Sequence, residues 1–367
     1  MSEYGTAFPI RTPRSGMLWR LALIGAVVAA LAAAFAYVGG WLTPRRLTPG
    51  RIVDTFEQVA GRHPGFRRNH AKGVCVTGYF EGSGAASAYS RTALFGAGQR
   101  TPVGRFALPG GNPYAPDASV PIRSPALRFT LADGEQWRTG MNSMPVFPVA
   151  TPQAFYEQLR ASRPDPRTGK PDPGRMRAFF AAHPETRAFR AWASTARPSA
   201  SYATEAYNAL DAFYFVDADG RRHAVRWGVV PEAAGRPDAV GPAGPDGLAQ
   251  DLVRRLAQGP LRWHLRVTLA APGDLTDDAS RAWPADRPQL DAGTLVLERT
   301  EPQDAGPCRD VNYDPLVLPQ GIEASDDPLL PARSAVYADS HERRTGEETG
   351  VSPPRTAPPT PAREPRA

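Results

Sequence analysis

An apolar run near the start of the chain sets the first limit on how the chain can fold. No charged residue occurs from Leu21 to Leu42. Because an α-helix rises about 1.5 Å per residue, a run of this length can cross the roughly 30 Å hydrocarbon core of a bilayer. The sequence therefore predicts one transmembrane anchor at residues 21–42, separate from whatever the rest of the chain forms.

The charges around this run predict its orientation. Arg11, Arg14 and Arg20 precede it, and the positive-inside rule then keeps residues 1–20 in the cytoplasm and sends the rest to the periplasmic, or other extracytoplasmic, side. Arginines just after the run weaken this argument. A cleaved signal sequence is the alternative, because residues 34–36 (AFA) carry the small side chains that a signal peptidase requires.

The opposite end of the chain has a different composition. Residues 346–367 carry six prolines, all from Pro353 onward, and few apolar side chains, so we expect a disordered tail there. The segment from 45 to 345 is left as one large domain. The net charge of +6 is spread along the chain without a lysine block, so no nucleic-acid partner is indicated.

A tyrosine near the end of that domain has an arginine one helical turn before it. Residues 333–344 read RSAVYADSHERR, and on a helix Arg333 and Tyr337 would share a face. A guanidinium beside a phenol favours the phenolate, which is a ligand for ferric haem iron. The alternative is an amphipathic surface helix whose arginines are solvated.

A histidine far upstream precedes a predicted strand. Residues 67–80 read RRNHAKGVCVTGYF, and the alternation from Val74 to Phe80 predicts a strand with one face in a core. His70 then lies at the mouth of that strand. Histidine is the usual general base near neutral pH, although a single histidine before a strand is more often structural.

A third segment, residues 140–149 (GMNSMPVFPV), places an asparagine and a phenylalanine close together. Asn142 could donate a hydrogen bond to a substrate, and Phe147 and Phe155 could line a pocket. The alternative is a turn asparagine before a proline and two core aromatics.

Together these segments resemble the catalase superfamily, in which a distal histidine, a distal asparagine and a proximal tyrosine occur in this order. Weaker similarities support it: a strand at 101–106, a helix ending at 183–185, and a hairpin at 213–227 around an Asp-Gly turn. Because the chain ends soon after Tyr337, it is expected to resemble the shortened branch, the catalase-related peroxidases.

The resemblance implies an α+β fold, with a catalase-type closed antiparallel β-barrel and surrounding helices, and haem b as the cofactor. Tyr337 would be the axial ligand of the haem iron and Arg333 its partner. His70 would move a proton between the peroxide oxygens while Asn142 holds the far oxygen, leaving a ferryl haem. The remaining cofactor-binding residues implied by the resemblance are Arg67, Arg105 and Arg344 at the propionates, and Phe147 and Phe155 near the porphyrin or its channel.

Two departures from the family pattern bear on activity. Ala107 stands where the family typically has a serine that hydrogen-bonds the distal histidine, and Asn69 stands where a valine usually precedes it. Weaker support for His70 reduces activity without abolishing it. We therefore expect a peroxidase that reduces hydrogen peroxide or organic peroxides with an unidentified organic electron donor, in peroxide detoxification.

Other functions remain open. The alternatives are a true catalase, an enzyme for fatty-acid hydroperoxides, a haem sensor or carrier without turnover, and a membrane-anchored protein without haem. A homo-oligomer is possible. The two cysteines, Cys75 and Cys308, could pair in an oxidising compartment, but their places in a strand and a late loop lead us to expect two independent thiols. The cysteines and histidines show no structural metal motif.

Overall fold

The computed structural model describes residues 14–38, 46–197, 199–233 and 244–347, in two compact units that divide after Arg51. The first unit contains helix α1 (Arg14–Val38). Its stretch Gly16–Val38 has a mean hydropathy of 2.4 and is long and apolar enough to span a membrane, a test that a signal sequence also passes. Residues 39–42 of the expected span, and 348–367 of the expected tail, lie outside the described residues.

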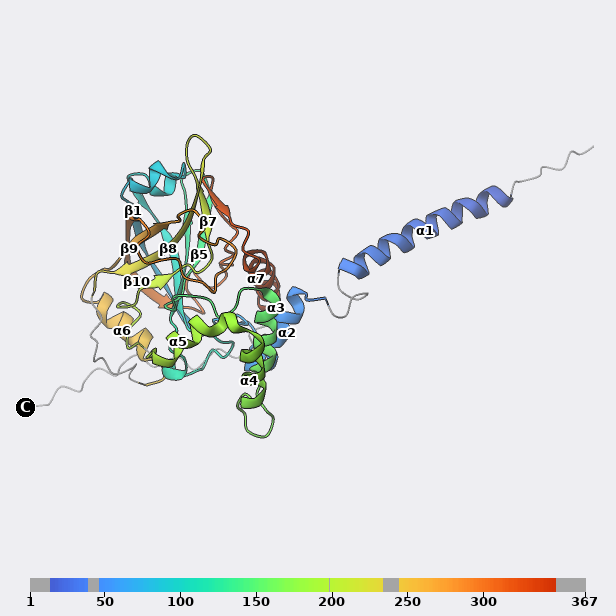
Figure 1. The fold of residues 1–367 in the computed structure, drawn as a ribbon, viewed down its shortest axis with the longest axis horizontal. Coiled ribbons are helices and arrows are strands. Elements are labelled where there is room, and N and C mark those ends of the chain that lie inside the picture. Colours follow the sequence, from blue (N-terminus) through green and yellow to red (C-terminus); the bar gives the residue numbers. More distant parts are fainter. Residues whose placement is uncertain (1–13, 39–45, 198, 234–243, 348–367) are drawn as a thin grey trace, which may run out of the picture. The chain divides into compact units, whose positions relative to one another are not determined.

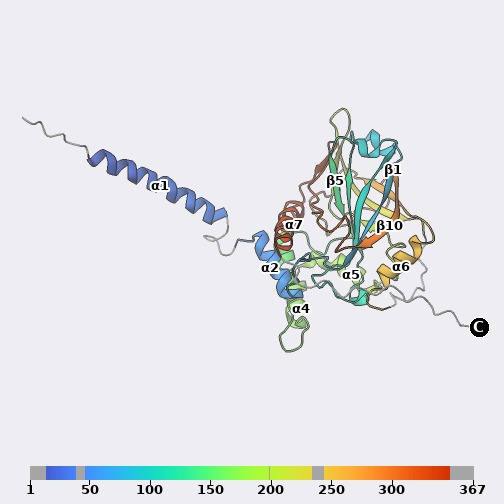
Figure 2. The same ribbon diagram turned by 180° about the vertical axis from the view of Figure 1, so that it is seen from behind.

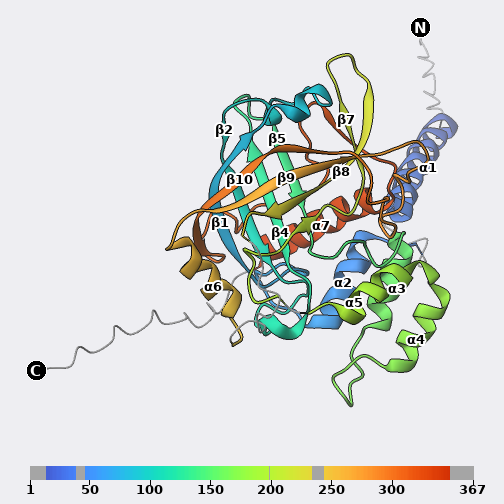
Figure 3. The ribbon, with the colours of Figure 1, turned by 60° about the vertical axis from the view of Figure 1, so that its left-hand side comes forward.

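The second unit is built on one antiparallel sheet (Figure 3). Its strands follow the order β11-β7-β8-β9-β10-β1-β3-β4-β5, with β2 on β1 and β6 on β8. The strand bounds are β1 Gly73–Gly82, β2 Gln99–Arg100, β3 Pro102–Ala107, β4 Ser124–Thr130, β5 Gln136–Gly140, β6 Tyr207–Asn208, β7 Phe213–Val216, β8 Arg222–Pro231, β9 Leu261–Leu269, β10 Gln289–Pro302 and β11 Ile322–Ala324. The predicted first strand and the hairpin of β7 and β8 are both confirmed.

The expected complete closure of the barrel is not confirmed. Strands β5 and β11 end the pairing order without pairing to each other. Beside β5 runs an irregular segment instead, which accepts one hydrogen bond at Val317 from the Arg138 amide; Pro315 and Pro319 flank this contact, and proline cannot donate to a ladder. An isolated bridge within the described residues links Asn142, just after β5, to Asn208 of β6, which pairs with β8 on the other side of the gap.

Aromatic side chains fill the core that the curled sheet encloses. Trp137 and Trp227 lie with ring centroids 5.0 Å apart, and the Trp227 indole donates to the Thr139 hydroxyl at 2.9 Å, which satisfies a buried polar group. On β1, Val74, Val76 and Phe80 are buried in this core. The alternation in the sequence therefore predicted the inward face correctly.

Helices cover the ends and sides of the sheet (Figures 1 and 2). The α-helices of the second unit are the part of α2 (Pro49–Ala60) from Ile52 onward, α3 Pro152–Ala161, α4 Pro173–Ala182, α5 Arg187–Thr195, α6 Gly247–Leu256 and α7 Leu329–Thr345, with short 3-10 turns at Ala85–Ala88, Ala93–Phe95, Asp117–Ser119 and Pro184–Thr186. Thr151 and Asp172 cap α3 and α4 with their side-chain oxygens, and proline occupies the first turn of each.

Charged side chains tie the end of α7 to the loop before β1. The buried Arg68 pairs with Glu57 of α2 at 2.7 Å and with Glu347, just beyond α7, at 2.5 Å. The Gly65 amide also donates to Glu347, at 2.9 Å. Burial of Glu347 opposes its charge, but hydrogen bonds from Arg68 and Gly65 outweigh it and lower its pKa to about 2.

Candidate active site

A cavity of about 570 Å³ lies in the second unit, within the range of small-molecule and cofactor sites. The loop before β1, the strands β3 to β5, helices α2, α3 and α7, and the segment after β10 contribute to its lining. All nine residues predicted for the site line this one cavity: Arg67, His70, Arg105, Asn142, Phe147, Phe155, Arg333, Tyr337 and Arg344.

His70 has an uncommon backbone conformation. It is the one residue other than glycine with a positive φ, 55°, in the described part of the chain, and such a conformation needs support from its surroundings. Asn69 provides this support, because its side-chain oxygen accepts from the His70 amide at 3.0 Å and from the Gly110 amide at 2.7 Å. The Ala71 amide adds a third contact, to the Gly110 carbonyl at 2.9 Å.

The imidazole of His70 is held neutral. Burial is the main cause that lowers its pKa to about 3, and the charges of Arg105, Arg333 and Arg67 lower it further. Its Nδ1 is buried and has no hydrogen-bond partner among the described residues. Ala107 also lines the cavity, and its methyl group offers no hydrogen bond.

Asn142 has its side-chain oxygen already engaged. The Ser124 hydroxyl donates to Asn142 Oδ1 at 2.6 Å, and the backbone of Asn142 is fixed by two hydrogen bonds with Asn208, at 3.0 and 2.8 Å. The side-chain nitrogen of Asn142, Nδ2, is therefore the group left to donate a hydrogen bond to a ligand. Asn142 therefore has two roles: its backbone forms the bridge to Asn208, and its side chain offers a hydrogen-bond donor to the cavity.

Aromatic rings form an apolar wall of the cavity. The ring centroids of Phe147 and Phe155 are 5.5 Å apart, and Phe155 also lies 5.9 Å from Phe56 of α2. Two of these rings come from helices, which fix their positions. The wall could pack against a flat apolar ligand.

Three arginines gather at another side of the cavity, where Arg105 and Arg344 are almost fully buried. Arg67 donates to the carbonyls of Cys308, Arg309 and Val311 at 2.8 to 3.1 Å. Burial lowers the pKa of Arg67, and the neighbouring charges of Arg105 and Arg344 add to the effect. Burial likewise lowers the pKa of Arg105 to about 10.

These guanidinium groups are only partly satisfied. Arg105 Nε and Arg344 Nη2 are buried without a hydrogen-bond partner among the described residues. The carboxylate paired with Arg344 is Asp310, at 3.5 Å and largely exposed. Buried unpaired donors with excess positive charge fit an anionic ligand, and carboxylates are natural partners for guanidinium groups.

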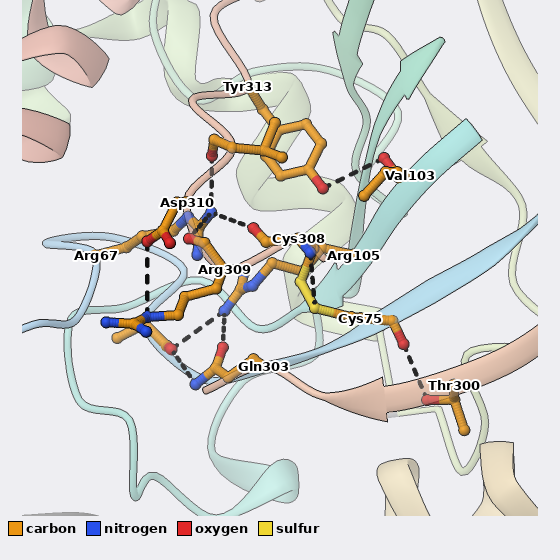
Figure 4. The surroundings of a disulfide bond; sticks show 12 residues. Arg67, Cys75, Val103, Arg105, Thr300, Gln303, Cys308, Arg309, Asp310 and Tyr313 are labelled. Atoms are coloured by element: carbon orange, nitrogen blue, oxygen red, sulfur yellow. Dashed lines mark hydrogen bonds and ion pairs between the residues drawn. A yellow bond between two sulfur atoms is a disulfide. The ribbon is translucent and has the colours of Figure 1, made fainter. Parts of the chain in front are cut away.

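A disulfide closes this side of the site and corrects the expectation of two independent thiols. Cys75 and Cys308 are bonded, with Cα atoms 5.4 Å apart (Figure 4). Pairing of β1 with β10 places Cys75 opposite Glu301, and the chain after β10 then returns to bring Cys308 alongside. The bond attaches β1 to the segment that carries Val311 and Tyr313, both in the cavity lining.

Tyr337 lies on α7 beside Arg333, as the spacing predicted. The Arg333 guanidinium carbon is 5.8 Å from the centroid of the Tyr337 ring, and Arg333 also forms an ion pair with the buried Asp211. Although burial opposes its charge, Asp211 and Tyr337 together raise the pKa of Arg333 above its ordinary value. The guanidinium therefore stays charged.

A second carboxylate lies behind this pair. Burial is the main cause that raises the pKa of Asp327 to about 7, and the charge of Asp211 raises it further. Asp327 Oδ1 accepts from the Leu329 amide at 2.9 Å at the start of α7, whereas Oδ2 is buried without a partner in the described ranges.

Sequence reasoning missed three residues that support the site and read a fourth only in part. Asp211, Asp327 and Ser124 carry no local signal, since each reaches the site only through packing of distant segments. Asn69 was noticed as a polar replacement near His70, but its hydrogen bonds to two backbone amides could not be read from spacing.

The cavity fits a haem group on two counts. It combines an apolar aromatic wall with buried, unpaired guanidinium donors that match carboxylate groups, and it contains a histidine and a tyrosine that can act on or bind an iron centre.

Comparisons with known proteins agree with this fit to haem. A family model described as Catalase matches residues 52–359. The chain is 42% identical over 303 residues to a catalase-related peroxidase of Synechococcus elongatus, covering 82% of this chain and 89% of that protein. It is 34% identical over 315 residues to a catalase-related peroxidase of Mycolicibacterium paratuberculosis, covering 84% and 98%.

Solved structures show the same fold. A fungal catalase superposes with a TM-score of 0.66 at 20% identity, covering 78% of this chain and 60% of that one. A bacterial catalase gives 0.68 at 20% identity, covering 78% and 58%. The chain thus spans about three fifths of the length of these solved catalases.

Proposed function

The chain belongs to the catalase family, and from this membership we propose that it is a haem-dependent peroxidase that reduces hydrogen peroxide or organic peroxides with an organic electron donor. The observation that carries the proposal is the convergence of a neutral histidine, an amide donor and a tyrosine on one cavity. Its relatives at 42% and 34% identity bear the name catalase-related peroxidase. The role that follows is peroxide detoxification.

Family membership implies haem binding, and we propose haem b within the domain at 45–345. Arg67, Arg105 and Arg344 would hold its propionates, and Phe147 and Phe155 would pack on the porphyrin or line its channel. Tyr337 would bind the iron, with the Arg333 guanidinium beside its ring. When bound, haem supplies the iron centre that reacts with peroxide and stores the oxidising equivalents that a donor removes.

His70 would act as the general base. Because its imidazole is neutral, it can take a proton from one peroxide oxygen and return it to the other. Asn142 would donate a hydrogen bond from its amide nitrogen and hold the peroxide in place, since its oxygen already accepts from Ser124. The buried setting limits competition from water.

The orientation of His70 favours peroxidase activity over dismutation. No group hydrogen-bonds its Nδ1 within the described residues, so no hydrogen bond at this nitrogen orients the ring. Dismutation requires the ring to serve two peroxides in succession, and a loosely oriented ring serves both steps less well.

A place outside the cytoplasm is part of the proposal. The apolar helix α1 can anchor the chain, and the disulfide is of a kind that persists in oxidising compartments. We propose a membrane-anchored protein whose haem domain faces the extracytoplasmic side, with residues 1–20 in the cytoplasm. The expected disordered tail at 346–367 is wrong at its start, because Glu347 pairs with Arg68 and belongs to the domain.

The test is the oxygen released per hydrogen peroxide consumed by the haem-loaded full chain, with and without an oxidisable organic donor. We expect little oxygen and donor-dependent peroxide loss, and expect His70→Ala to abolish that loss. Abundant oxygen unaffected by donor would identify a true catalase. Ala107→Ser, which restores a hydroxyl near His70, should raise the oxygen yield.

A further inference from the structure

Most of the chain's net charge is concentrated on one helical region. Residues 157–197 contain nine lysines or arginines and four acidic residues, a net charge of +5 within a chain of +6. Eight of the basic side chains are exposed, and we call them the basic helical surface: Arg160, Arg167, Lys170, Arg175, Arg177, Arg187, Arg190 and Arg197.

The acidic residues of the region leave this charge uncompensated. Glu157 and Glu185 both contact His183, at 2.9 Å each. Asp165 and Asp172 approach arginines only loosely, Arg167 at 3.5 Å and Arg175 at 3.9 Å. The other six side chains of the basic helical surface form no ion pair in the part of the chain that the structure describes.

The segments that carry these charges adjoin each other. Arg175 of α4 donates to the Arg163 carbonyl at 2.6 Å, which joins α4 to the loop after α3. Arg190 of α5 lies 4.5 Å from the centroid of the Phe180 ring in α4, and α3, α4 and α5 lie together (Figure 3). The charges thus belong to one region of the surface.

We propose that the basic helical surface binds the anionic phospholipid headgroups of the membrane in which α1 is anchored. This goes beyond the proposed peroxidase function and does not depend on it. Anionic lipids attract exposed arginines and lysines within a Debye length of the bilayer. Arginine also suits phosphate, because its fork of donors matches phosphate oxygens.

The length of the connection favours lipid over other anions. Residues 39–48 separate α1 from α2 and can extend about 35 Å at most. A domain of this size has a radius of gyration of about 20 Å. If α1 spans the bilayer, the connection is too short for the domain to move further from the bilayer than about its own width. Lipid headgroups are then the anionic groups that the domain can always contact.

Docking there would bring one wall of the cavity to the membrane. Helix α3 contributes Arg160 to the basic helical surface and Phe155, Gln158 and Leu159 to the cavity lining. A hydrophobic donor or peroxide dissolved in the bilayer would then have a short path to the site.

The test uses the haem-loaded full chain in nanodiscs of phosphatidylcholine, with and without phosphatidylglycerol. Ala178→Cys places an exposed thiol on α4, and Ala132→Cys places a control thiol in the turn between β4 and β5. Both native cysteines are paired, so a neutral alkylating reagent reports on the new thiol. We expect Cys alkylation at 178 to slow several-fold with phosphatidylglycerol and to recover in high salt, while the rate at 132 stays constant.

Replacing Arg167, Lys170, Arg175 and Arg177 by glutamine should remove the protection at 178. A matched set of exposed arginines elsewhere, Arg221, Arg262, Arg281 and Arg299 replaced by glutamine, should leave it intact. Haem absorbance confirms that each variant is folded. Equal rates at 178 in both nanodiscs, or protection only by added double-stranded DNA, would overturn the proposal.

Discussion

At the scale of single residues, the backbone of His70 has hydrogen-bonding support that, within the described part of the chain, the Nδ1 of its ring lacks. Asn69 holds the backbone of His70 in its left-handed conformation through two hydrogen bonds, whereas Ala107 gives its ring nothing to bond. Hydrogen bonds therefore fix the backbone of His70, while the Nδ1 atom of its ring has no partner among the described residues.

We predict that Asn69→Ala slows the reaction with peroxide by about 30-fold, because two hydrogen bonds that hold the His70 backbone are lost, each worth about 1 kcal/mol. The rate is measured by stopped-flow absorbance of the haem. Asn112→Ala is the matched control, since Asn112 likewise accepts from a backbone amide, that of Tyr114 at 2.9 Å. Equal rates in both variants would show that Asn69 does not position His70.

The low pKa of His70 predicts an unusual pH profile. A base with a pKa of about 3 is fully available at neutral pH, so the rate should be flat from about pH 8 to pH 5, and fall only as the pH approaches 3. The same shift makes His70 contribute stability above its unfolded pKa of about 6.5, which is lost as the pH falls through about 3. A rate that halves near pH 6.5 would contradict this.

At the scale of elements, individual strands and helices were predictable from the sequence, whereas the contacts between distant segments were not. Alternation in residues 74–80 identified β1, and the spacing of Arg333 and Tyr337 identified a face of α7. The gap between strands β5 and β11 lies where the segment with Pro315 and Pro319 runs beside β5. Asp211 reaches Arg333 from a segment far away in sequence. Such contacts follow from tertiary packing, which local patterns do not encode.

Helix α7 should be held in place by Glu347. We predict that Glu347→Ala lowers the free energy of unfolding by about 2 kcal/mol at pH 7, because it leaves the buried Arg68 with one carboxylate partner. Denaturant unfolding measures the change. Glu342→Ala, an exposed position on α7, is the control.

The pH dependence of that effect follows from the pKa of about 2 for Glu347. A lowered carboxyl pKa gives stability that is complete above the unfolded value of about 4.5 and is lost as the pH falls through about 2. The difference between wild type and Glu347→Ala should therefore shrink below pH 4.5. A constant difference down to pH 2 would show that charge on Glu347 is not its source.

At the scale of the whole molecule, the disulfide joins the start of the domain to its end, across a separation of 233 residues. The sequence left the pairing of these two cysteines open, because they meet only when β1 pairs with β10. The bond also attaches the segment with Val311 and Tyr313 to the sheet beside Arg67 and Arg105 (Figure 4).

We predict that replacing Cys75 and Cys308 together by serine lowers the free energy of unfolding by about 3 kcal/mol, the typical contribution of a native disulfide. Haem should also dissociate faster, since the segment beside the arginines is released. Denaturant unfolding and haem transfer to apomyoglobin measure the two effects. Reductant should reproduce both in the wild type and change neither in the serine variant.

The same bond imposes an order of events on synthesis. Translation at about 5 to 20 residues per second delivers Cys308 roughly 10 to 50 seconds after Cys75, so the first thiol waits alone while most of the domain emerges. With two cysteines in the chain, no wrong intramolecular partner exists. Maturation would therefore call for an oxidant but no disulfide shuffling, and the thiol that waits would be open to capture by another protein until the last part of the domain arrives.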